Sequence, residues 1–496
     1  MTESSILKNY INGEFIESCS TELLDVMDPA LGEPIAQVPM STKDEVDAAV
    51  AAAVAAFPAW RNTPGIQRIQ PFLKLQAFLK ENIEALTEIT VRNHGKEWDA
   101  AEGEVVRAYQ MCEAAIGVPE LQKGQFMSDI ATGIDEYTVR EPLGVFVIIP
   151  PFNFPVMIPF WFMPFAVATG NTYIIKSNEQ TPIPMYRIFE TCIDKSGFPP
   201  GVVNLVHGSV DVATWLIEHP GVKGVSSVGS TPVAKSIYTK ATSLGKRAQC
   251  HGGANNFLVV DHTANLDKIL SNMMNSIFGN SGQRCLAGKH VVVVGDQAFY
   301  DTFKERFVET AAGLVVGCGL DKTSFLGPIV AKRNLDKLLG QIQQGIDDGG
   351  LLILDGRGIT VSGCENGFFL GPCIFENVEP GSSLLRDEVF GPVACLHRKD
   401  TLDEAIAMLN ADPRGNATTI YTESGENARH FRHEVQAGNI GINIGVVAPL
   451  AWFPFAGAKE SFFGTLRAQG REAVEFFTQD RVVIERFHGS TKIEWD

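Results

Sequence analysis

Short apolar runs that alternate with helical segments constrain the fold more than any other feature of this chain. Residues 145–149 are rich in β-branched side chains and include no polar one, as expected of a strand buried on both faces of a sheet. Because helical segments separate such runs, the pattern predicts parallel βαβ units in an α/β fold. The further runs lie at 172–175, 202–206, 222–228, 257–260 and 291–294, and the helical segments at about 182–195, 210–218, 231–243 and 264–278.

Two longer stretches outside this alternation are also predicted to be helical. Residues 41–57 begin with Thr42 and Glu45, whose spacing is that of a capping box, and a second helical stretch covers about 66–120. The apolar run 152–169 approaches the length of a membrane span, but prolines and an asparagine interrupt it, so we interpret it as a buried core segment.

Composition bounds the class of protein. The 496 residues predict about three domain-sized units. A net charge of −17 argues against a nucleic acid or an anionic membrane as partner. Nine scattered cysteines without a CxxC pair predict neither a disulfide framework nor a structural zinc site. No metal-ligand spacing is found among His207, His290, His430 and His433.

The first seven residues carry no secretory signal, so we expect a cytoplasmic protein.

Two segments favour a nucleotide site, although no GxGxxG motif follows the early strands. Lys176 and Glu179 come at the end of a predicted strand, where open α/β sheets bind ligands. Such a pair can hydrogen-bond ribose hydroxyls, and the carboxylate would repel a 2′-phosphate, which favours NAD over NADP. The alternative is a solvated Lys–Glu pair. Gly229 and Ser230 lead into a helix whose N-terminus can face a pyrophosphate.

The predicted reacting centre is Cys285. It follows Gly282 and stands next to Arg284, and a nearby cation favours the nucleophilic thiolate. Asn153 comes directly after a buried strand, and its amide, like the backbone N–H of Cys285, can donate to a developing oxyanion. The alternative for Asn153 is an ordinary turn residue beside proline.

These motifs together resemble the aldehyde dehydrogenase family over essentially the whole chain. The resemblance implies an aldehyde dehydrogenase-like α/β fold, with a Rossmann-type NAD-binding domain, an α/β catalytic domain and a small β oligomerisation element. The matching segments are Pro151-Phe152-Asn153-Phe154-Pro155, Ile175-Lys176-Ser177-Asn178-Glu179, Gly229-Ser230-Thr231, Gly252-Gly253, Gly282-Gln283-Arg284-Cys285, Glu388-Val389-Phe390-Gly391-Pro392 and Phe453-Pro454-Phe455-Ala456-Gly457.

The resemblance also assigns roles and boundaries. It implies a thiolate nucleophile at Cys285 and an oxyanion contact from Asn153. It places the NAD-binding domain at 1–128 and 148–254, the catalytic domain at 255–470 and the oligomerisation element at 129–147 and 471–490. The implied cofactor contacts are Lys176 and Glu179 to the adenosine ribose, Glu388 to the nicotinamide ribose, and Pro151, Phe152, Gly229, Ser230 and Phe390.

One departure from the family pattern bears on the reaction. Most hydrolytic members carry a glutamate two residues before the Gly-Gly pair, where this chain has Cys250. A neutral thiol is a poor general base, so we expect a thiol acceptor, coenzyme A, to take the acyl group. His251 is the competing base, but neighbours in an extended segment face opposite ways, which disfavours it. A disulfide between Cys250 and Cys285 is left open.

The departure fits the CoA-acylating methylmalonate-semialdehyde dehydrogenase branch of the family. In that branch, arginines matching Arg107 and Arg284 are associated with the substrate carboxylate, and a guanidinium pairs with a carboxylate bidentately. The alternative is a structural ion pair. By resemblance Phe455 and Phe162 line the aldehyde tunnel. The other aromatic residues near them, expected mostly in the core, are Phe160, Trp161, Trp452 and Phe453.

The resulting hypothesis is NAD-dependent oxidation of a short acidic semialdehyde through a Cys285 thioester, with transfer of the acyl group to coenzyme A. The strand-like segments 129–142 and 472–488 are expected to pair with each other or with another subunit, in a homodimer or homotetramer. Two rivals remain: a non-acylating aldehyde dehydrogenase, and a catalytically silent family member that binds or supports a partner.

Overall fold

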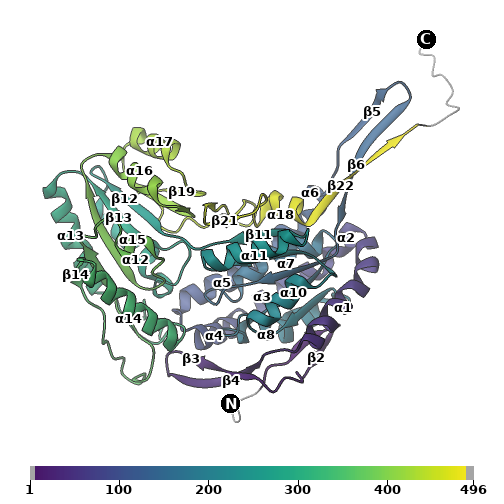
Figure 1. The fold of residues 1–496 in the computed structure, drawn as a ribbon, viewed down its shortest axis with the longest axis horizontal. Helices are drawn as coiled ribbons and strands as arrows, with labels where there is room; N and C mark the ends of the chain where they lie inside the picture. Colours follow the sequence, from purple (N-terminus) through teal and green to yellow (C-terminus); the bar gives the residue numbers. More distant parts are fainter. Residues whose placement is uncertain (1–5, 487–496) are drawn as a thin grey trace.

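Two large sheets, each covered by helices, make up the body of the computed structural model, which describes residues 6–486 (Figure 1). The first five residues, and residues 487–490 of the expected oligomerisation element, lie outside the described part. One sheet is built from strands before residue 252, with the short strand Phe462–Phe463 added at one edge, and the other from residues beyond 255; a narrow three-stranded sheet extends away from the body.

The first sheet has eight strands, and its five central strands are parallel, as the alternating pattern predicts. Antiparallel strands lie at both edges. Across the sheet the order is β2 (Glu14–Ile16), β1 (Asn9–Ile11), β9 (Val203–Val206), β8 (Thr172–Lys176), β7 (Val145–Ile149), β10 (Val222–Val228), β11 (Arg247–His251) and β21 (Phe462–Phe463).

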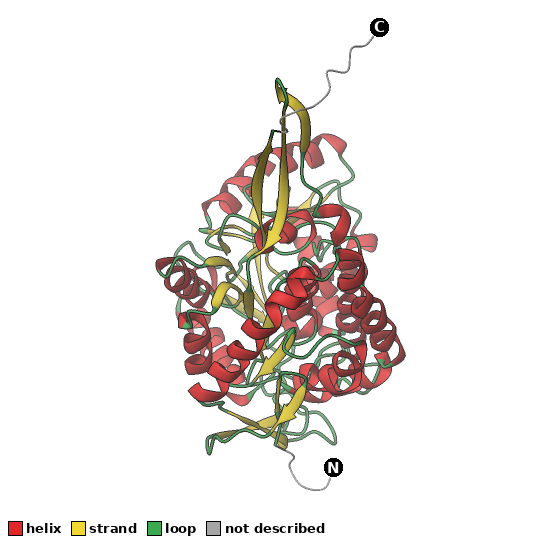
Figure 2. Ribbon diagram, turned by 90° about the vertical axis from the view of Figure 1, so that its right-hand side faces the viewer, coloured by secondary structure: helices red, strands yellow, loops and turns green. Residues whose placement is uncertain are grey.

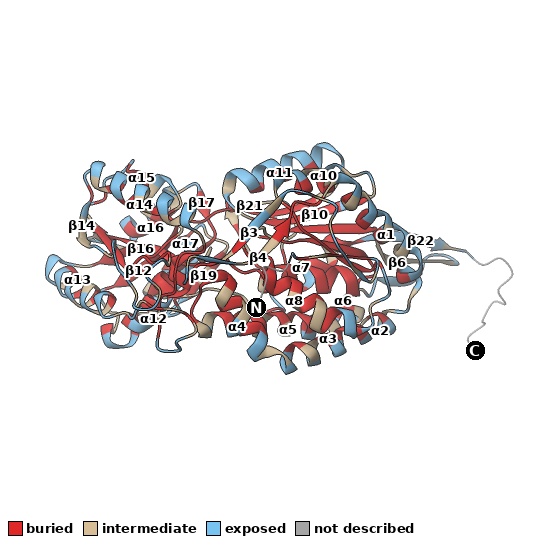
Figure 3. Ribbon diagram, turned by 90° about the horizontal axis from the view of Figure 1, so that it is seen from below, coloured by how far each residue is buried: buried red, intermediate tan, exposed pale blue. Residues whose placement is uncertain are grey.

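Helices cover both faces of this sheet (Figure 3). One face packs against α1 (Lys43–Asn62), α10 (Val210–Glu218) and α11 (Thr231–Ser243). The capping box of Thr42 and Glu45 is present at the start of α1, so that prediction is confirmed. The other face is covered by α3 (Gln70–Glu81), α4 (Ile83–His94), α5 (Trp98–Ile116), α7 (Met157–Ala168), α8 (Ile183–Ile188), the π-helical turn Phe189–Ile193 and α9 (Asp194–Ser196).

Helix α7 occupies the apolar run that approaches membrane-span length. From Ile158 onward its residues are buried beneath the first sheet, so the prediction of a core segment is confirmed. Within residues 6–486, no helix is both long enough and apolar enough to cross a membrane.

The second sheet has seven strands, and helices α12 (Leu266–Phe278) and α13 (Gln297–Ala312) cover one face while α16 (Leu402–Ala411) and α17 (Gly425–Glu434) cover the other. Further helices in this half are α14 (Lys332–Asp347) and α15 (Ser383–Arg386). The strand order is β14 (Leu351–Leu354), β15 (Cys373–Glu376), β16 (Val393–Lys399), β13 (Gly288–Val294), β12 (Asn256–Asp261), β18 (Ala417–Tyr421) and β19 (Asn439–Ile442).

The narrow third sheet joins β5 (Phe126–Ala131), β6 (Ile134–Pro142) and the C-terminal β22 (Thr478–Glu485), and it projects from the body (Figure 2). β6 and β22 pair antiparallel from Thr478 opposite Pro142 to Glu485 opposite Asp135. The expected pairing of the two strand-like segments with each other is therefore confirmed.

The predicted strand at 472–488 was wrong in its first part, because α18 (Gly470–Phe477) is a helix. Its apolar residues Ala473, Val474, Phe476 and Phe477 are buried together on one helical face. Apolar residues spaced in this way are typical of a helix. The exposed residues that form the strand begin only at Thr478.

The remaining elements are short. β3 (Leu23–Asp28) and β4 (Glu33–Pro39) form a two-stranded hairpin, and β17 (Arg414–Gly415) pairs antiparallel with the distant β20 (Ala458–Lys459). Two four-residue helices, α2 (Gly65–Arg68) and α6 (Val118–Leu121), flank the longer ones. Trp452 and Phe453 lie in a loop and are 55% and 66% exposed, so their expected burial was wrong.

Candidate active site

The nucleophile loop is a short 3₁₀ turn, Gly279–Gly282, that follows α12 and leads to Cys285. Asn280, Ser281 and Gly282 have φ angles of 55°, 50° and 67°, three left-handed residues in a row. A side chain at Gly282 would collide with the carbonyl of Gly391. The motif therefore needs glycine at this position for backbone conformation and for close approach of a second segment.

Buried polar side chains hold this unusual backbone in place. Glu97 accepts the backbone N–H of Asn280 at 2.8 Å, and the Ser281 hydroxyl donates to the carbonyl of Gly327 at 2.6 Å. Lys289 donates to the carbonyl of Gly282 at 2.9 Å, and burial lowers the pKa of Lys289 to about 7. Sequence reasoning missed Glu97 and Lys289, which belong to none of the motifs.

Two side-chain amides fix the backbone of Cys285. Asn256 and Asn416 donate to its carbonyl at 2.8 Å and 3.0 Å, and Asn256 also donates to the carbonyl of Ala287 at 2.9 Å. Asn256 lies at the start of β12 and Asn416 just before β18. Because these neighbouring strands are parallel, both amides lie at the N-terminal ends of the strands, on the same side of the sheet's strand ends. The sequence offered no signal for Asn416.

The Cys285 thiol is half-buried, and its pKa differs from the sequence-based expectation. Burial and the nearby Glu388 carboxylate raise the pKa of Cys285 to about 12, while Arg284 opposes them. Arg284 thus favours the thiolate as expected from the sequence, but desolvation of the charged form outweighs this one guanidinium.

Asn153 stands in the turn between β7 and α7 and is 3% exposed. Its side-chain amide donates to the carbonyl of Gln283 at 2.8 Å, two residues before Cys285. An asparagine amide has two hydrogens, and this contact uses one of them. The fold thus brings Asn153 next to the nucleophile loop, as the oxyanion hypothesis requires.

Glu388 connects the loop with the Gly-Gly segment. It accepts the backbone N–H of Ala254 at 3.0 Å, and Gly253 packs so closely that a side chain there would meet the Glu388 carboxylate. Burial raises the pKa of Glu388. Two residues on, the ring of Phe390 packs edge-to-face on Phe152 with centroids 5.7 Å apart.

The predicted nucleotide contacts lie at the carboxyl ends of β8 and β10. Lys176 Nζ is 3.3 Å from Glu179, but Lys176 is only 4% exposed, so the alternative of a solvated pair was wrong for the lysine. Gly229 follows β10, and Ser230 is the N-cap of α11 with an exposed side chain that makes no capping hydrogen bond. These groups leave the first turn of α11 open to an anion.

Cys250 lies fully buried in the core between the first sheet and helices α10 and α11, where burial raises its pKa to about 12. His251 is 2% exposed on the opposite face, among the rings of Phe162, Phe455 and Phe462. Burial lowers the pKa of His251 to about 3. The predicted opposite orientation is confirmed, and since Cys285 packs with the other core, the two cysteines are both free thiols.

The two arginines occupy separate elements. Arg107 is half-buried on α5 and donates to Gln110 at 3.2 Å. Arg284 donates to the carbonyl of Asn275 at 3.1 Å, and its charge acts on the buried Glu97 carboxyl, lowering the pKa that burial raises. Within residues 6–486 neither guanidinium forms a direct ion pair.

Aromatic residues pack in the core next to the Cys285 loop. Phe455 is 2% exposed and its ring lies 4.4 Å from that of Trp161 in α7. Phe162, the next residue of α7, is fully buried in the same core, against which Cys285 packs.

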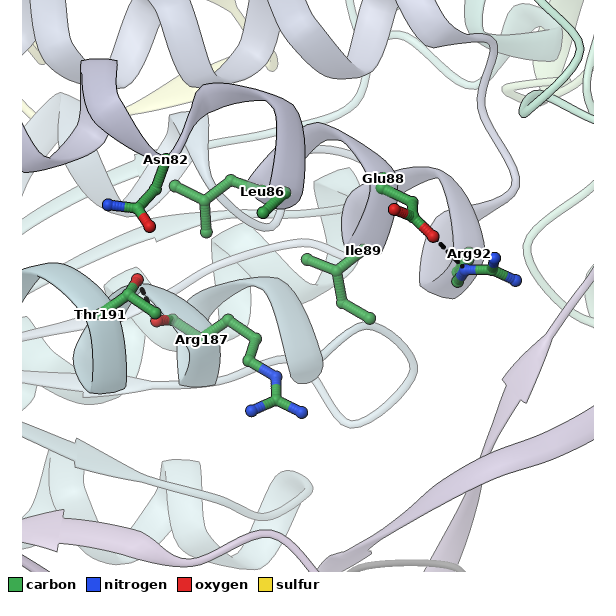
Figure 4. A pocket seen from close by; sticks show the side chains of 8 residues that line it. Asn82, Leu86, Glu88, Ile89, Arg92, Arg187 and Thr191 are labelled. Carbon is green, nitrogen blue, oxygen red and sulfur yellow. Dashed lines mark hydrogen bonds and ion pairs between the residues drawn. The ribbon is translucent and has the colours of Figure 1, made fainter. Parts of the chain in front are cut away.

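A separate surface pocket of about 240 Å³ lies between α4 and α8 (Figure 4). Its walls carry the ion pair of Glu88 and Arg92 at 2.9 Å and the side chains of Ile89 and Arg187. None of the predicted site residues lines it, so it belongs to a different part of the surface.

Comparison with known proteins identifies the family. The model of the aldehyde dehydrogenase family matches residues 15–483. Malonate-semialdehyde dehydrogenase 3 of Geobacillus kaustophilus is 42% identical over 487 residues, which is 98% of this chain and 100% of the relative. Methylmalonate-semialdehyde dehydrogenase of Oceanimonas doudoroffii superimposes with a TM-score of 0.95 at 35% identity, over 98% of this chain and 99% of that one.

A Sinorhizobium meliloti protein solved in complex with NAD superimposes with a TM-score of 0.96 at 35% identity, covering 99% of this chain and 100% of that one. The fold, the order of the motifs and these likenesses agree along nearly the full length. The chain belongs to the aldehyde dehydrogenase family.

Proposed function

We propose that this protein oxidises a short acidic semialdehyde with NAD, through a thioester on Cys285, and passes the acyl group to coenzyme A. The observation that carries the proposal is that hydrogen bonds fix the Cys285 backbone, while the position of the usual general base is occupied by Cys250, a buried and neutral thiol. The names of the relatives, malonate- and methylmalonate-semialdehyde dehydrogenases, point to the same substrates.

The residues fit NAD. Lys176 and Glu179, at the end of β8, are the proposed partners of the ribose hydroxyls, and the open first turn of α11, with Gly229 and Ser230, suits a pyrophosphate. Glu388, beside Cys285, is suited to the nicotinamide ribose. Pro151, Phe152 and Phe390 complete the proposed contacts. When bound, NAD supplies the acceptor for the hydride that leaves the aldehyde carbon.

The chain's own groups carry out the covalent chemistry. The Cys285 sulfur, once deprotonated, attacks the aldehyde carbon and forms a carbon–sulfur bond. The free hydrogen of the Asn153 amide and the backbone N–H of Cys285 donate to the oxygen that gains negative charge. Loss of hydride leaves a thioester on Cys285. The thiolate of coenzyme A then takes the acyl group and releases the Cys285 thiolate.

The acceptor follows from Cys250, which stands where hydrolytic members carry their base, and from its neighbour His251. Cys250 stays protonated with a pKa of about 12, and a pKa of about 3 makes His251 a weak base. Neither activates water well at neutral pH. A thiol with its own nucleophilic strength has less need of a base, which favours coenzyme A over water.

The proposed substrate carboxylate is held by arginine. Arg107 has its guanidinium engaged with only one neutral side chain among residues 6–486, so it is available for a carboxylate. Arg284 stands next to Cys285, and Phe455 and Phe162 form the apolar wall of the aldehyde tunnel. Arginine at this place would select short aldehydes with an acidic end.

A non-acylating reaction is the second candidate. The Glu388 carboxylate acts on Cys285 strongly enough to raise its pKa, and burial raises the pKa of Glu388 itself. A carboxylate with a raised pKa beside the thioester can act as a base for water. A silent family member is disfavoured, because a protein without the chemistry has no reason to keep Cys285, Asn153, Lys176 and Glu388 together.

We also propose a homodimer or homotetramer in the cytoplasm. The narrow sheet of β5, β6 and β22 presents exposed apolar side chains away from the body, and an exposed apolar patch of this kind favours association. These side chains are Phe126, Met127, Ile130, Val139, Val482 and Ile484.

NADH formation from malonate semialdehyde and from propanal, with and without coenzyme A, tests the proposal. We expect steady turnover only with coenzyme A, and one NADH per Cys285 followed by a stop without it. Steady turnover without coenzyme A would favour the hydrolytic candidate. In a matched set, Arg107→Gln should slow the oxidation of malonate semialdehyde and leave the rate with propanal unchanged. No NADH with either aldehyde would contradict the proposal.

A further inference from the structure

We propose that Lys96 and Glu104 are positioning residues, which fix the Asn153 amide where the oxyanion forms; the inference rests on the role proposed for Asn153. Lys96 belongs to the connection between α4 and α5, and Glu104 to α5. Neither touches the predicted site of the aldehyde, so both would act through Asn153.

Lys96 holds the backbone of Asn153 directly. Its Nζ donates to the Asn153 carbonyl at 2.7 Å and to Glu104 at 2.7 Å. The ammonium lies 4.1 Å above the centre of the Phe154 ring, so it also contacts the residue that follows Asn153. Both side chains of the pair are fully buried, and a charge-assisted hydrogen bond is strong and short in such surroundings.

Glu104 holds the other end of the same turn. Its second oxygen accepts the backbone N–H groups of Val156 at 2.6 Å and Met157 at 3.0 Å. These are the groups at which α7 begins, and a carboxylate there is favoured by the helix dipole. The segment from Asn153 to Met157 is therefore clamped by one ion pair at both of its ends.

The side chain of Asn153 depends on that clamp. Its amide donates to the Gln283 carbonyl at 2.8 Å, and the geometry of this contact sets where the remaining hydrogen points. Apart from Lys96, the donor nearest the Asn153 carbonyl among residues 6–486 is the Asn280 amide at 3.5 Å, the limit of a hydrogen bond. Without Lys96 the Asn153 carbonyl keeps only this long contact, so the backbone that carries the amide is held less firmly.

A double-mutant cycle tests the inference. The variant Lys96→Met/Glu104→Gln removes both buried charges together, so neither is left unpaired, and the new amide keeps an oxygen that can accept the helix N–H groups. The measured quantity is the rate constant of the first NADH burst at saturating NAD and propanal, which reports formation of the thioester. NAD affinity and the unfolding midpoint are measured alongside.

We expect the pair variant to slow the burst by about tenfold or more, with unchanged NAD affinity. When Asn153→Ala is already present, the pair variant should slow the burst by less than about twofold, because the group through which it acts is gone. Equal slowing in both backgrounds would overturn the inference, since it would show that the pair supports the fold generally. No slowing in the parent would overturn it as well.

The two proposals fail differently. If Asn153→Ala keeps the parent burst rate, the oxyanion role of Asn153 fails, and the positioning role falls with it. If Asn153→Ala is slow and the pair variant is not, only the positioning role fails. Should the pair variant not fold, Glu104→Asp replaces it: the shorter carboxylate keeps the charge but not the reach to both Lys96 and α7. The control is Lys123→Met/Glu120→Gln, which removes an exposed ion pair at α6 and should change nothing.

Discussion

Cys250 and His251 are neighbours in strand β11, yet their side chains enter different cores on opposite faces of the first sheet. Cys250 packs with helices α10 and α11, and His251 packs with the aromatic residues on the α7 side, where Cys285 also lies. The position at which hydrolytic relatives carry their base is thus occupied by a thiol that faces apolar core.

If Cys250 only fills core space, its loss should affect stability and not the reaction. We predict that Cys250→Ala lowers the free energy of unfolding by about 1 kcal/mol, the usual effect of removing one buried heavy atom. The steady rate of NADH formation with coenzyme A should stay within about twofold of the parent, and without coenzyme A both proteins should stop after one NADH per Cys285. Denaturant unfolding and steady-state assays measure the two effects.

Cys395→Ala provides the control, because Cys395 is 3% exposed in the core of the second sheet. It should show the same loss of stability. A large fall in the steady rate of Cys250→Ala alone would mean that Cys250 takes part in the reaction, contrary to its place in the apolar core.

His251 should make the protein sensitive to acid. Its pKa is about 3 in the folded state and near 6.5 in the unfolded state, so between these values the unfolded chain binds more protons. Stability is then fully present above pH 6.5 and falls as the pH drops toward 3, by about 2 kcal/mol at pH 5 for this one group. His207 and His397, with pKa values of about 4, act in the same direction.

His251→Leu isolates the contribution of His251. We predict that this variant loses about 2 kcal/mol less than the parent between pH 7 and pH 5, as measured by urea unfolding at each pH. His430→Leu is the control, since His430 is an exposed residue whose ring pairs with Asp403 at the surface. An identical slope in the parent and in His251→Leu would show that the imidazole is not held neutral.

Most strands and helices could be predicted because their signals are local. Runs such as 145–149 are apolar throughout, and Thr42 with Glu45 marks a helix start within four residues. The site was predictable only in part. Asn416 reaches the carbonyl of Cys285 from 131 residues away, and Lys96 reaches Asn153 from 57 residues away. No local pattern marks such partners, because pairing of distant strands and packing of α5 on α7 create them.

The Cys285 thiol should react slowly in the free enzyme. With a pKa of about 12, the thiolate fraction and the rate of alkylation by iodoacetamide should rise about tenfold per pH unit from pH 6 to pH 9 without levelling off. Glu388→Gln removes a negative charge, lowers the pKa of Cys285 and so should speed alkylation at a given pH. Peptide mass analysis separates Cys285 from the exposed Cys19.

Asp387→Asn is the matched control for that measurement. Asp387 precedes Glu388 but forms an exposed pair with Arg386, so its charge is screened and the alkylation rate of Cys285 should not change. An alkylation rate that levels off near pH 7 in the parent would mean that the thiolate forms without cofactor. Burial would then not be the main influence on the pKa of Cys285.

The last prediction separates the two demands made on Gly282, a left-handed backbone and close contact with a second segment. Gly133 has almost the same φ, 68° against 67°, but a side chain there would enter open space. Gly133→Ala therefore measures backbone strain alone, and we expect a loss of about 1 kcal/mol with a normal NADH burst. Gly282→Ala adds a collision with the Gly391 carbonyl and should cost about 3 kcal/mol or more.

The NADH burst shows whether the reaction depends on the close contact between Gly282 and the Gly391 segment. In Gly282→Ala the collision displaces either the Cys285 loop or the segment that carries Glu388, so NADH formation should fall below about one hundredth of the parent rate. Circular dichroism and the unfolding midpoint establish that the variant is folded. A folded Gly282→Ala with a normal burst would show that the two segments separate without loss of chemistry, and that the fixed geometry around Cys285 is not what makes the thiol reactive.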